Sequence, residues 1–400
     1  MFSRTLSEKI TSKYLQGKII MILGPRQVGK TTLVETLLKD IPSIDKIFFT
    51  GDDSYDRAIL SSESFSQIDR IIGKTNYIVI DEWQKIPHIG NTLKILVDRY
   101  KDTKQIFVIG SSSVHLLDTT NEPLTGRKFV FTLFSISVWE YIDRYGIRDT
   151  QKELETHLLY GMYPEVLELP SRDEKITRLT ELSESGLYRD ILEFQEVRNS
   201  GSIHKLLELL ALQIGSEVSY NELAIQLGMS TNTVERYIDL LEKSYVIFRL
   251  SPYFTNKRKE ISKMKKIYFY DLGIRNAIIR SFNPLRLRTD LGGLFENFCL
   301  IERMKHRHYS GSLAYPHFWR GSQQEEIDLI ELTWEDIQAF EIKYKPQKIH
   351  IPKKFSDLYP KASYELVSSE NYLDFLMIQK TLRSETILWR EDIEDVEVSI

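Results

Sequence analysis

A glycine-rich loop near the start of the chain carries the clearest chemical signal. Residues 24–31 read Gly-Pro-Arg-Gln-Val-Gly-Lys-Thr and fit the spacing G-x-x-x-x-G-K-[ST]. In such a loop the glycines let the backbone turn tightly, and its amide groups approach phosphate oxygens. Lys30 can then reach the β- and γ-phosphates, and the Thr31 hydroxyl can ligate Mg²⁺. The loop therefore predicts a site for a nucleoside triphosphate, with contacts from Gly24, Pro25, Arg26, Gln27, Val28, Gly29, Lys30, Thr31 and Thr32.

The segments on either side of the loop agree with this interpretation. Residues 18–23 are apolar after the first one and predict a strand buried on both faces, as in a parallel sheet. Residues 32–38 predict an amphipathic helix, whose amino end adds positive potential beside the loop. The short pattern alone can occur by chance, but a strand before it and a helix after it argue strongly against coincidence.

A second predicted strand, over residues 77–80, ends in the acidic pair Asp81-Glu82. Apolar residues followed by two acids are typical of a Walker B strand. Asp81 would hold Mg²⁺, directly or through water, and Glu82 would polarise an attacking water molecule. Two solvated acids at a strand end are the alternative, but the loop at residues 24–31 favours the catalytic interpretation. The pair therefore indicates hydrolysis of the triphosphate and not binding alone.

Two further polar residues are candidates for contact with the γ-phosphate. Residues 105–109 predict a strand that leads into a run of serines, so Ser111 or Ser112 could contact the phosphate or the attacking water. A plain serine-rich turn fits this run equally well. Arg127 lies on a turn just before a strand predicted over residues 128–137. It could compensate γ-phosphate charge in its own or a neighbouring subunit, or it could be an ordinary surface arginine.

The order of these motifs resembles one known family. The chain looks like the prokaryotic AAA-type ATPases that carry, in their C-terminal half, domain of unknown function 4143, which is related to restriction nucleases. The resemblance rests on six runs, at residues 24–33, 51–58, 78–87, 108–117, 124–141 and 161–167. It implies an αβα sandwich that binds ATP with Mg²⁺ and, by the usual inference, hydrolyses it, but it implies no known substrate. The chain departs from the family at Gly161-Met162, where two glycines are commoner.

The middle of the chain predicts helices followed by a helix-turn-helix. Residues 150–200 show apolar residues at helical spacing and suit the helical lid that follows the sheet in AAA-type modules. Arg189 could reach nucleotide from such a lid, or it could pair with Glu193 one helical turn further on. Three helices with helix-turn-helix spacing then follow, over residues 203–214, 219–228 and 233–242.

Two strands after these helices would form a wing. They are predicted over residues 246–250 and 266–270, and the segment between them is basic through Lys257, Arg258, Lys259, Lys263 and Lys265. A basic wing is typical of contact with the phosphate backbone of DNA. The third helix also carries acidic residues, and winged helices serve as spacers and protein-binding modules too. Contact with DNA and contact with a protein partner therefore both stay open.

The last part of the chain carries an arrangement typical of metal-dependent nucleases. One predicted strand holds Asp328, and the returning strand holds Glu341 and Lys343, which are two residues apart and share one face. This gives Asp…Glu-x-Lys, as in the PD-(D/E)-x-K class, where two carboxylates hold Mg²⁺ and the lysine helps to activate water. Glu296, on a preceding helix, could add a ligand. A charged hairpin face, or a nuclease-like fold that no longer cuts, is the alternative.

Composition limits the class of protein. The chain has 400 residues, enough for two or three domains, and 42% of them are hydrophobic, which is ordinary for a globular protein. Its 53 basic and 57 acidic residues give a net charge of −4, which excludes a globally basic nucleic-acid binder but not a basic patch. The single cysteine, Cys299, cannot form an internal disulfide. No apolar run approaches the ~18 residues of a membrane helix, and the first residues do not resemble a secretory signal. We therefore expect a cytoplasmic protein without a membrane partner.

These observations together predict an α/β chain of four parts. They are a P-loop ATPase core over residues 1–145, a helical lid over 146–202, a winged-helix domain over 203–272 and a nuclease-like domain over 273–400. The expected function is ATP binding and hydrolysis coupled to work on DNA or a DNA-associated partner. An ATP-gated nuclease and a slowly hydrolysing switch that binds a protein partner are the alternatives, and a kinase fits less well. If Arg127 acts on a neighbouring subunit, a homo-oligomer follows.

Overall fold

The computed structural model describes residues 2–111, 124–186, 200–253, 264–312, 314–321, 325–333 and 336–376. Several predicted residues lie outside this part of the chain: Ser112, Arg189, Glu193, Lys257, Arg258, Lys259 and Lys263. The chain forms two compact units. The first unit comprises Met1–Ala211, Tyr220–Phe248 and Phe269–Phe282, and the second comprises Leu212–Ser219, Arg249–Tyr268 and Asn283–Ile400.

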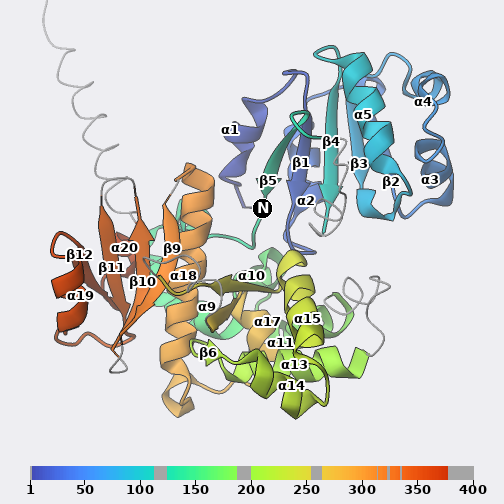
Figure 1. Ribbon diagram of the computed structural model, residues 1–400. Coiled ribbons are helices and arrows are strands. Elements are labelled where there is room, and N and C mark those ends of the chain that lie inside the picture. The colour runs from blue at the N-terminus through green and yellow to red at the C-terminus, as the bar shows by residue number, and fades with distance from the viewer. Residues whose placement is uncertain are drawn as a thin grey trace, which may run out of the picture. The chain divides into compact units, whose positions relative to one another are not determined.

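A five-stranded sheet forms the centre of the first unit (Figure 1). Its strands are β1 (Ile19–Leu23), β2 (Lys46–Thr50), β3 (Tyr77–Asp81), β4 (Gln105–Gly110) and β5 (Lys128–Thr132), in the order β2-β3-β4-β1-β5. Every neighbouring pair is parallel. The carboxyl ends of the strands therefore lie along one side of the sheet, which we call the carboxyl edge. The predicted α/β fold with a parallel sheet is confirmed.

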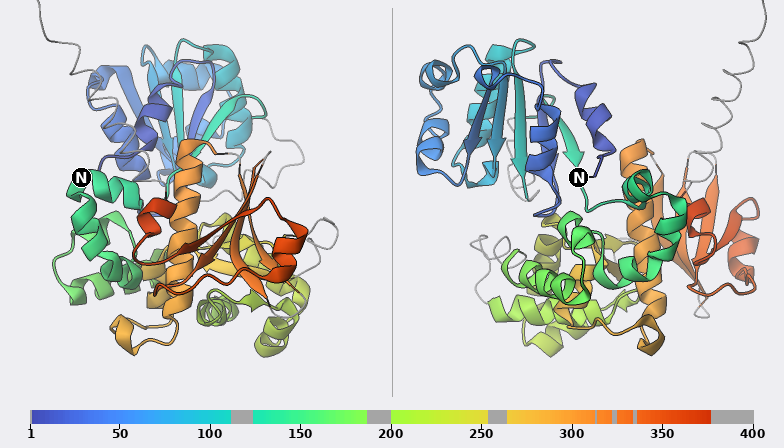
Figure 2. Two further views of the ribbon diagram at one scale, coloured as in Figure 1. Left: turned by 90° about the vertical axis from the view of Figure 1, so that its left-hand side faces the viewer. Right: turned by 180° about the vertical axis from the view of Figure 1, so that it is seen from behind.

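Helices cover both faces of this sheet. On one face α3 (Ser54–Leu60), α4 (Phe65–Ile72) and α5 (Ile89–Tyr100) share a buried core with alternate residues of β1. On the opposite face α2 (Lys30–Leu37) packs against β4, and α1 (Leu6–Thr11) packs against α2 (Figure 2). The 3₁₀ turns η1 (Ser43–Asp45) and η2 (Trp83–Lys85) lead into β2 and out of β3. This packing fixes the strands whose ends form the carboxyl edge.

The strand predicted over residues 128–137 is shorter in the structure, since β5 ends at Thr132. Ser137 instead begins α7 (Val138–Tyr145) with a capping box. The Ser137 hydroxyl accepts a hydrogen bond from the Glu140 backbone at 3.2 Å, and the Glu140 side chain accepts one from the Ser137 backbone at 3.0 Å. These bonds satisfy amides at the start of the helix, so the apolar run after Thr132 leads to a helix and not to more strand.

A group of helices follows α7. They are α8 (Ile147–Lys152), α9 (Leu154–Tyr160), α10 (Pro164–Glu168), α11 (Arg172–Glu181) and the π-helical turn η3 (Leu182–Gly186). Gly161 follows α9 with a φ of +69°. The position requires glycine, because a Cβ there would lie 2.0 Å from Asp271 Oδ1. Asp271 caps α17 (Leu272–Ile278) and also accepts a hydrogen bond from the Met162 backbone at 2.8 Å. One carboxylate therefore ties α17 to the segment after α9.

The predicted helix-turn-helix region contains three helices and a small sheet. The helices are α13 (Ser200–Leu212), α14 (Tyr220–Leu227) and α15 (Thr231–Lys243), and α14 packs against α15. The strands are β6 (Glu217–Val218), β7 (Ile247–Leu250) and β8 (Lys265–Phe269), in the order β6-β8-β7. Ser230 caps α15 through the backbone of Thr233. The three helices, β7 and β8 lie where the sequence predicts them, β6 was not predicted, and the winged-helix assignment stays a prediction.

The second unit is built on a four-stranded sheet beside a long helix. Its elements are η4 (Leu285–Leu287), α18 (Leu291–Ser310), β9 (Tyr315–Arg320), β10 (Glu326–Leu332), β11 (Ile337–Ile342), α19 (Lys353–Leu358), β12 (Ser363–Val367) and α20 (Tyr372–Phe375). The strand order is β12-β11-β10-β9, and β12 alone runs parallel to its neighbour. The pairing of β9 with β10 is irregular between Ile327 and Ile330, next to Asp328.

Among the described residues of either unit, no helix is long and apolar enough to cross a membrane.

Arg4 ties the start of the chain to the edge of the first unit's sheet. Its guanidinium donates to Glu140 Oε1 at 3.0 Å and to the backbone oxygens of Val28 and Phe134 at 2.7 and 2.6 Å. Arg4 and Glu140 are only 9% and 2% exposed. The glycine-rich loop, the end of β5 and α7 are therefore held by one buried cation.

We expect Arg4→Met to destabilise the first unit by about 3 kcal/mol, because it leaves the buried Glu140 carboxylate without its cation. Urea unfolding followed by circular dichroism measures the change. The matched control is Lys152→Met, which removes an exposed pair with Asp149 at 3.0 Å and should cost less than about 1 kcal/mol. Equal effects of the two substitutions would contradict the role of Arg4.

Candidate functional site

The glycine-rich loop and the acidic end of β3 meet at the carboxyl edge. The loop leaves β1 after Leu23 and enters α2 at Lys30. Gly29, with φ of 92°, begins α2, and Gln27 also has a positive φ of 59°. The Thr31 hydroxyl donates a hydrogen bond to Asp81 Oδ2 at 2.7 Å. The two predicted Mg²⁺ ligands are therefore adjacent, and their hydroxyl and carboxylate oxygens are the kind of ligand that Mg²⁺ prefers.

The first glycine of the loop is required by the neighbouring strand. A Cβ on Gly24, whose φ is +144°, would lie 2.0 Å from the backbone oxygen of Leu133, just after β5. The backbone of Leu133 also donates a hydrogen bond to the oxygen of Leu23 at 2.8 Å. The loop therefore starts from a position where two backbones touch, and any side chain there must displace it.

Lys30 lies folded over its own loop. Its ammonium donates to the backbone oxygens of Gly24 at 2.9 Å and Pro25 at 2.6 Å, and the side chain is buried. The remaining predicted loop residues follow the same turn: Pro25 and Val28 are buried, Arg26 is half-buried, and Gln27 and Thr32 are exposed. The ammonium therefore sits against neutral acceptors that an anionic ligand could replace.

Glu82 and Ser111 are joined at the carboxyl edge by a residue to which sequence reasoning gave no role. The Gln84 amide donates to Glu82 Oε2 at 2.5 Å and to Ser111 Oγ at 3.1 Å. Ser111 follows β4 and is buried, and Glu82 has a left-handed backbone with φ of 48°. The spacing Asp81-Glu82-x-Gln84 was the signal available in the sequence, but it does not say where the amide points.

A second missed residue comes from the helices after the sheet. Arg178 of α11 donates to the side-chain oxygen of Gln27 at 2.8 Å. It also pairs with Glu165 at 2.7 Å and with Glu181 at 3.0 Å. The sequence analysis considered only Arg189 in this region, either as a residue that reaches nucleotide or as a partner of Glu193, and Arg189 lies outside the described residues. In the described part of the chain, Arg178 makes the connection to the loop.

Arg127 lies at the amino ends of the strands, whereas the glycine-rich loop lies at their carboxyl ends. Its backbone oxygen accepts a hydrogen bond from Ile19, the first residue of β1, at 2.9 Å. The length of β1, about 16 Å, separates it from Gly24. Its guanidinium pairs with Asp98 at 2.7 Å, which lowers the pKa of that carboxyl. A residue that precedes a parallel strand lies at the amino edge, which does not favour action of Arg127 on its own nucleotide site; action on a neighbouring subunit stays a prediction, and the exposed pair with Asp98 fits the alternative of an ordinary surface arginine.

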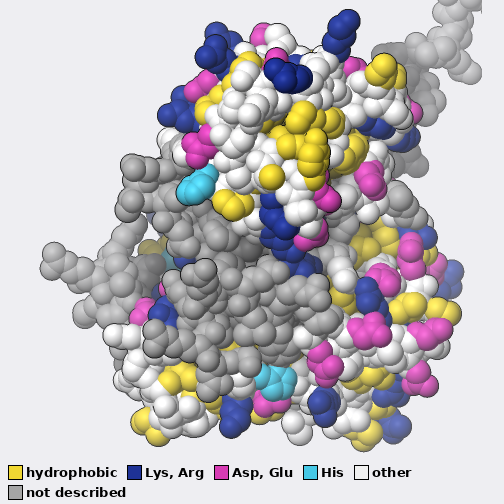
Figure 3. All heavy atoms as spheres, turned by 90° about the vertical axis from the view of Figure 1, so that its right-hand side faces the viewer, with side chains coloured by type: hydrophobic (Ala, Val, Ile, Leu, Met, Phe, Trp, Pro, Cys, Tyr) yellow, Lys and Arg dark blue, Asp and Glu magenta, His cyan; other side chains and the backbone are white. Residues whose placement is uncertain are grey.

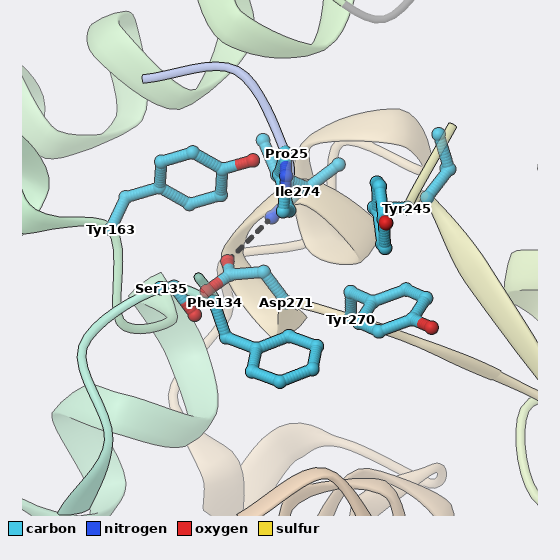
Figure 4. Close-up of a pocket in the computed structure, with 9 residues that line it drawn as sticks. Pro25, Phe134, Ser135, Tyr163, Tyr245, Tyr270, Asp271 and Ile274 are labelled. Carbon is cyan, nitrogen blue, oxygen red and sulfur yellow. Dashed lines mark hydrogen bonds between the residues drawn. The ribbon is translucent and has the colours of Figure 1, made fainter. Parts of the chain in front are cut away.

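A small cavity adjoins the loop at Pro25 (Figure 4). Aromatic side chains line it, namely Phe134, Tyr163, Tyr245 and Tyr270. Phe134 and Tyr270 are stacked, with ring centroids 5.8 Å apart and planes at 13°. Asp271 also faces the cavity while it accepts a hydrogen bond from the Ile274 backbone at 3.3 Å. The loop is therefore packed against both the helices after the sheet and the end of β8.

The predicted nuclease residues lie together in the second unit. Lys343 pairs with Glu341 at 2.7 Å and with Asp328 Oδ2 at 3.2 Å, and the Ile342 backbone donates to the same Asp328 oxygen at 2.8 Å. Glu296 is connected to this group by Lys266 of β8, whose ammonium contacts both Glu296 and Asp328. Among the described residues, no group of three or more His, Cys, Asp or Glu side chains is arranged to hold a metal ion.

Lys266 was missed by the sequence analysis. Its ammonium lies 2.9 Å from Glu296 and 3.8 Å from Asp328, and it also contacts Glu326. Burial lowers the pKa of this lysine, but the three carboxylates more than offset burial and raise the pKa above its usual range. Lys266 is therefore an ammonium group. Lys266 is the first residue of a predicted strand, and nothing local indicated that three carboxylates, from Glu296, Glu326 and Asp328, would contact it.

The predicted basic wing is represented in the described residues by Lys265 alone, which begins β8. On the face drawn in Figure 3, described lysine and arginine side chains are scattered among aspartate and glutamate side chains. That face agrees with a chain of nearly balanced charge, and contact with DNA stays a prediction.

Three family models match the chain. The model described as AAA domain matches residues 16–142, a domain of unknown function (DUF8612) matches residues 151–285, and a domain of unknown function (DUF4143) matches residues 291–381. The resemblance predicted from the sequence, an AAA-type core with domain of unknown function 4143 in the C-terminal part, is confirmed.

Similar proteins occur in bacteria and archaea. The uncharacterized protein Rv2008c of Mycobacterium tuberculosis is 28% identical over 335 residues, which is 82% of this chain and 70% of that protein. The uncharacterized protein MJ1637 of Methanocaldococcus jannaschii is 25% identical over 335 residues, 73% of this chain and 69% of that protein. Among solved structures, AMPPCP-bound DnaA from Aquifex aeolicus is 18% identical with a TM-score of 0.25, over 60% of this chain and 85% of that one.

We expect Gly24→Ala to weaken binding of a nucleoside triphosphate by at least about tenfold, because the new Cβ displaces the loop whose amides would face the phosphates. Titration with a fluorescent triphosphate analogue measures the affinity. Gly292→Ala is the control, since Gly292 lies exposed on α18 with open space around it. Unchanged affinity in Gly24→Ala would show that the loop does not hold the phosphates.

Proposed function

Because the chain combines an AAA domain with domain of unknown function 4143, we propose that it binds and hydrolyses ATP and uses this cycle to act on DNA or a DNA-associated partner. The observation that carries the proposal is the 2.7 Å hydrogen bond from Thr31 to Asp81. It places the phosphate loop and the acidic end of β3 side by side at the carboxyl edge, as hydrolysis of a triphosphate requires.

The residues at this edge fit ATP and Mg²⁺. The amino end of α2 offers backbone amides to the phosphates, and Lys30 would exchange the oxygens of Gly24 and Pro25 for phosphate oxygens. Thr31 and Asp81 would hold Mg²⁺, which neutralises negative charge on the phosphates when bound. The hydrogen bond between Thr31 and Asp81 brings their oxygen atoms to within 2.7 Å of each other, close enough for one cation to contact both.

Glu82 would accept a proton from the attacking water. Its carboxylate is held by the Gln84 amide at 2.5 Å, and the same amide touches Ser111 at 3.1 Å. A carboxylate with one oxygen already engaged keeps the other for water, and Ser111 is close enough to share in positioning it. Lys30, Glu82 and Ser111 are therefore the proposed catalytic set, and Arg127 is proposed to act only on a neighbouring subunit.

The remaining parts of the chain would transmit the cycle. Arg178 links the loop at Gln27 to α11, so a change in the loop reaches the proposed lid over residues 146–202. The stack of Phe134 on Tyr270 links the end of β5 to the end of β8, within the proposed winged-helix domain over residues 203–272. The basic residues at 257–265 support DNA as the target.

A nucleotide-dependent switch is the second candidate. The observation that favours it is the hydrogen bond between Gln84 and Glu82, because in a switch this bond would hold the carboxylate away from the γ-phosphate and its attacking water. The switch would bind ATP tightly, hydrolyse it slowly and signal to a protein partner without salt-dependent affinity for DNA.

We expect Glu82→Gln to lower kcat for ATP by about 100-fold or more while ATP affinity is kept, because only the proton acceptor is lost. Phosphate release measures turnover, and titration measures affinity. Glu35→Gln is the control, since it makes the same change on the exposed side of α2 and should leave both quantities unchanged.

Addition of DNA to the wild type should raise ATP turnover, and DNA affinity should fall with increasing salt as phosphate contacts are screened. Both are measured at two salt concentrations. Turnover that is negligible with and without DNA, together with tight ATP binding, would instead select the switch.

A further inference from the structure

A lysine lies in the middle of the second unit's acidic cluster, which consists of Glu296, Glu326, Asp328 and Glu341. Lys266 is 1% exposed. Its ammonium contacts carboxylates on two different elements: Glu296 of α18 at 2.9 Å, and Glu326 and Asp328 of β10, the latter at 3.8 Å. The cluster therefore contains its own cation, supplied by β8.

The backbone of β8 fixes where this cation can go. Lys266 pairs with Glu217 across the β6-β8 ladder, so the root of its side chain cannot move away from the cluster. Tyr268, two residues along on the same face of β8, donates to Glu296 Oε1 at 2.5 Å. The same Glu296 oxygen thus receives both the ammonium and the phenol. An ammonium that is so buried must keep its carboxylate partners, because removal from water without them is very costly.

The other side of Asp328 is also engaged. Its Oδ2 atom accepts from the Ile342 backbone at 2.8 Å and from Lys343 at 3.2 Å, while its Oδ1 atom faces Lys266. Lys343 in turn holds Glu341 at 2.7 Å. Lys343 belongs to the Asp…Glu-x-Lys pattern itself, but a divalent cation on Asp328 would also stand close to the Lys266 ammonium and would have to take carboxylate oxygens from it. The donor set therefore does not fit the metal site that the Asp…Glu-x-Lys pattern predicts.

We propose that Lys266 is the built-in cation of this cluster: its ammonium takes the place of a divalent metal ion among Glu296, Glu326 and Asp328. The second unit then has no metal-dependent route to cut a phosphodiester bond at Asp328. The inference stands apart from ATP hydrolysis, because no residue of the carboxyl edge enters it.

The test uses the full chain, stripped of metal with a chelator and free of nucleotide, and titrates it with Mn²⁺ alone. Calorimetry or electron paramagnetic resonance follows Mn²⁺ uptake. We expect wild type and Asp328→Asn to take up Mn²⁺ equally. Lys266→Met removes the ammonium and keeps an unbranched side chain. This variant should gain one site that binds Mn²⁺ at least about tenfold more tightly than the wild type binds it. Its thermal midpoint should be lower than that of wild type without Mn²⁺ and should rise when Mn²⁺ is added.

Lys305→Met is the matched control. Lys305 is also 1% exposed and pairs with the carboxylate of Glu302 at 2.6 Å. Its loss should lower the thermal midpoint without any recovery on addition of Mn²⁺, because Glu302 is not part of the acidic cluster. Recovery that is specific to Lys266→Met would separate replacement of a cation from general loss of a buried pair.

Two results would overturn the proposal. One is Mn²⁺ uptake by the wild type that falls at least about tenfold in Asp328→Asn, or plasmid nicking with Mg²⁺ or Mn²⁺ that this substitution abolishes. The other is a folded Lys266→Met variant that gains no Mn²⁺ site. If Lys266→Met fails to fold with and without Mn²⁺, the comparison of wild type with Asp328→Asn still decides the question.

Discussion

The hydrogen bond from Thr31 to Asp81 depends on the register of strands that are not neighbours. β4 lies between β1 and β3, so the loop must pass over the end of β4 to reach the acidic pair. Leu23 is level with Gly110, and Ile80 is level with Val108, so the three strands end within about one residue of one another. Because the ends are level, Asp81 at the end of β3 can meet Gly24 and Ser111, which follow β1 and β4. A slip of one residue in any strand would separate them and reverse the faces of its side chains.

The same edge concentrates unusual backbone conformations. Gln27 and Glu82 have positive φ values of 59° and 48°, which cost energy for side chains other than glycine. Neighbouring contacts hold both in place: Arg178 holds Gln27, and Gln84 holds Glu82. Strain of this kind persists only where the surroundings fix it, and it is common at functional sites. The contacts that the sequence did not predict are therefore the ones that maintain the conformations which the predicted residues need.

The sequence predicted the parts of the site that short-range patterns encode. Gly24 to Thr31 and Asp81-Glu82 stand next to their strands in the chain, and the parallel sheet brings them together without further information. Arg178 and Lys266 were missed because their partners are far away: Arg178 lies 151 residues from Gln27, and Lys266 lies 30 residues from Glu296. Arg127 was left open between its own site, a neighbouring subunit and the plain surface although it precedes its strand, whereas Gly24 and Ser111 follow their strands and Asp81 ends its own. The order of residue and strand, which is visible in the sequence, would have placed it correctly.

Lys30 and Lys266 are both buried lysines next to a predicted phosphate or metal site, yet their partners give them opposite roles. Lys30 donates to the neutral backbone oxygens of Gly24 and Pro25, so an anionic phosphate would be a stronger partner for its charge and exchange is favourable. Lys266 already has the carboxylates of Glu296, Glu326 and Asp328, so a new cation would have to break ionic contacts in a place that water reaches poorly. In the first arrangement a phosphate would replace neutral acceptors of Lys30, and in the second we propose that the ammonium completes the fold. The partner of a buried lysine, and not the lysine itself, therefore distinguishes a site that binds from one that is closed.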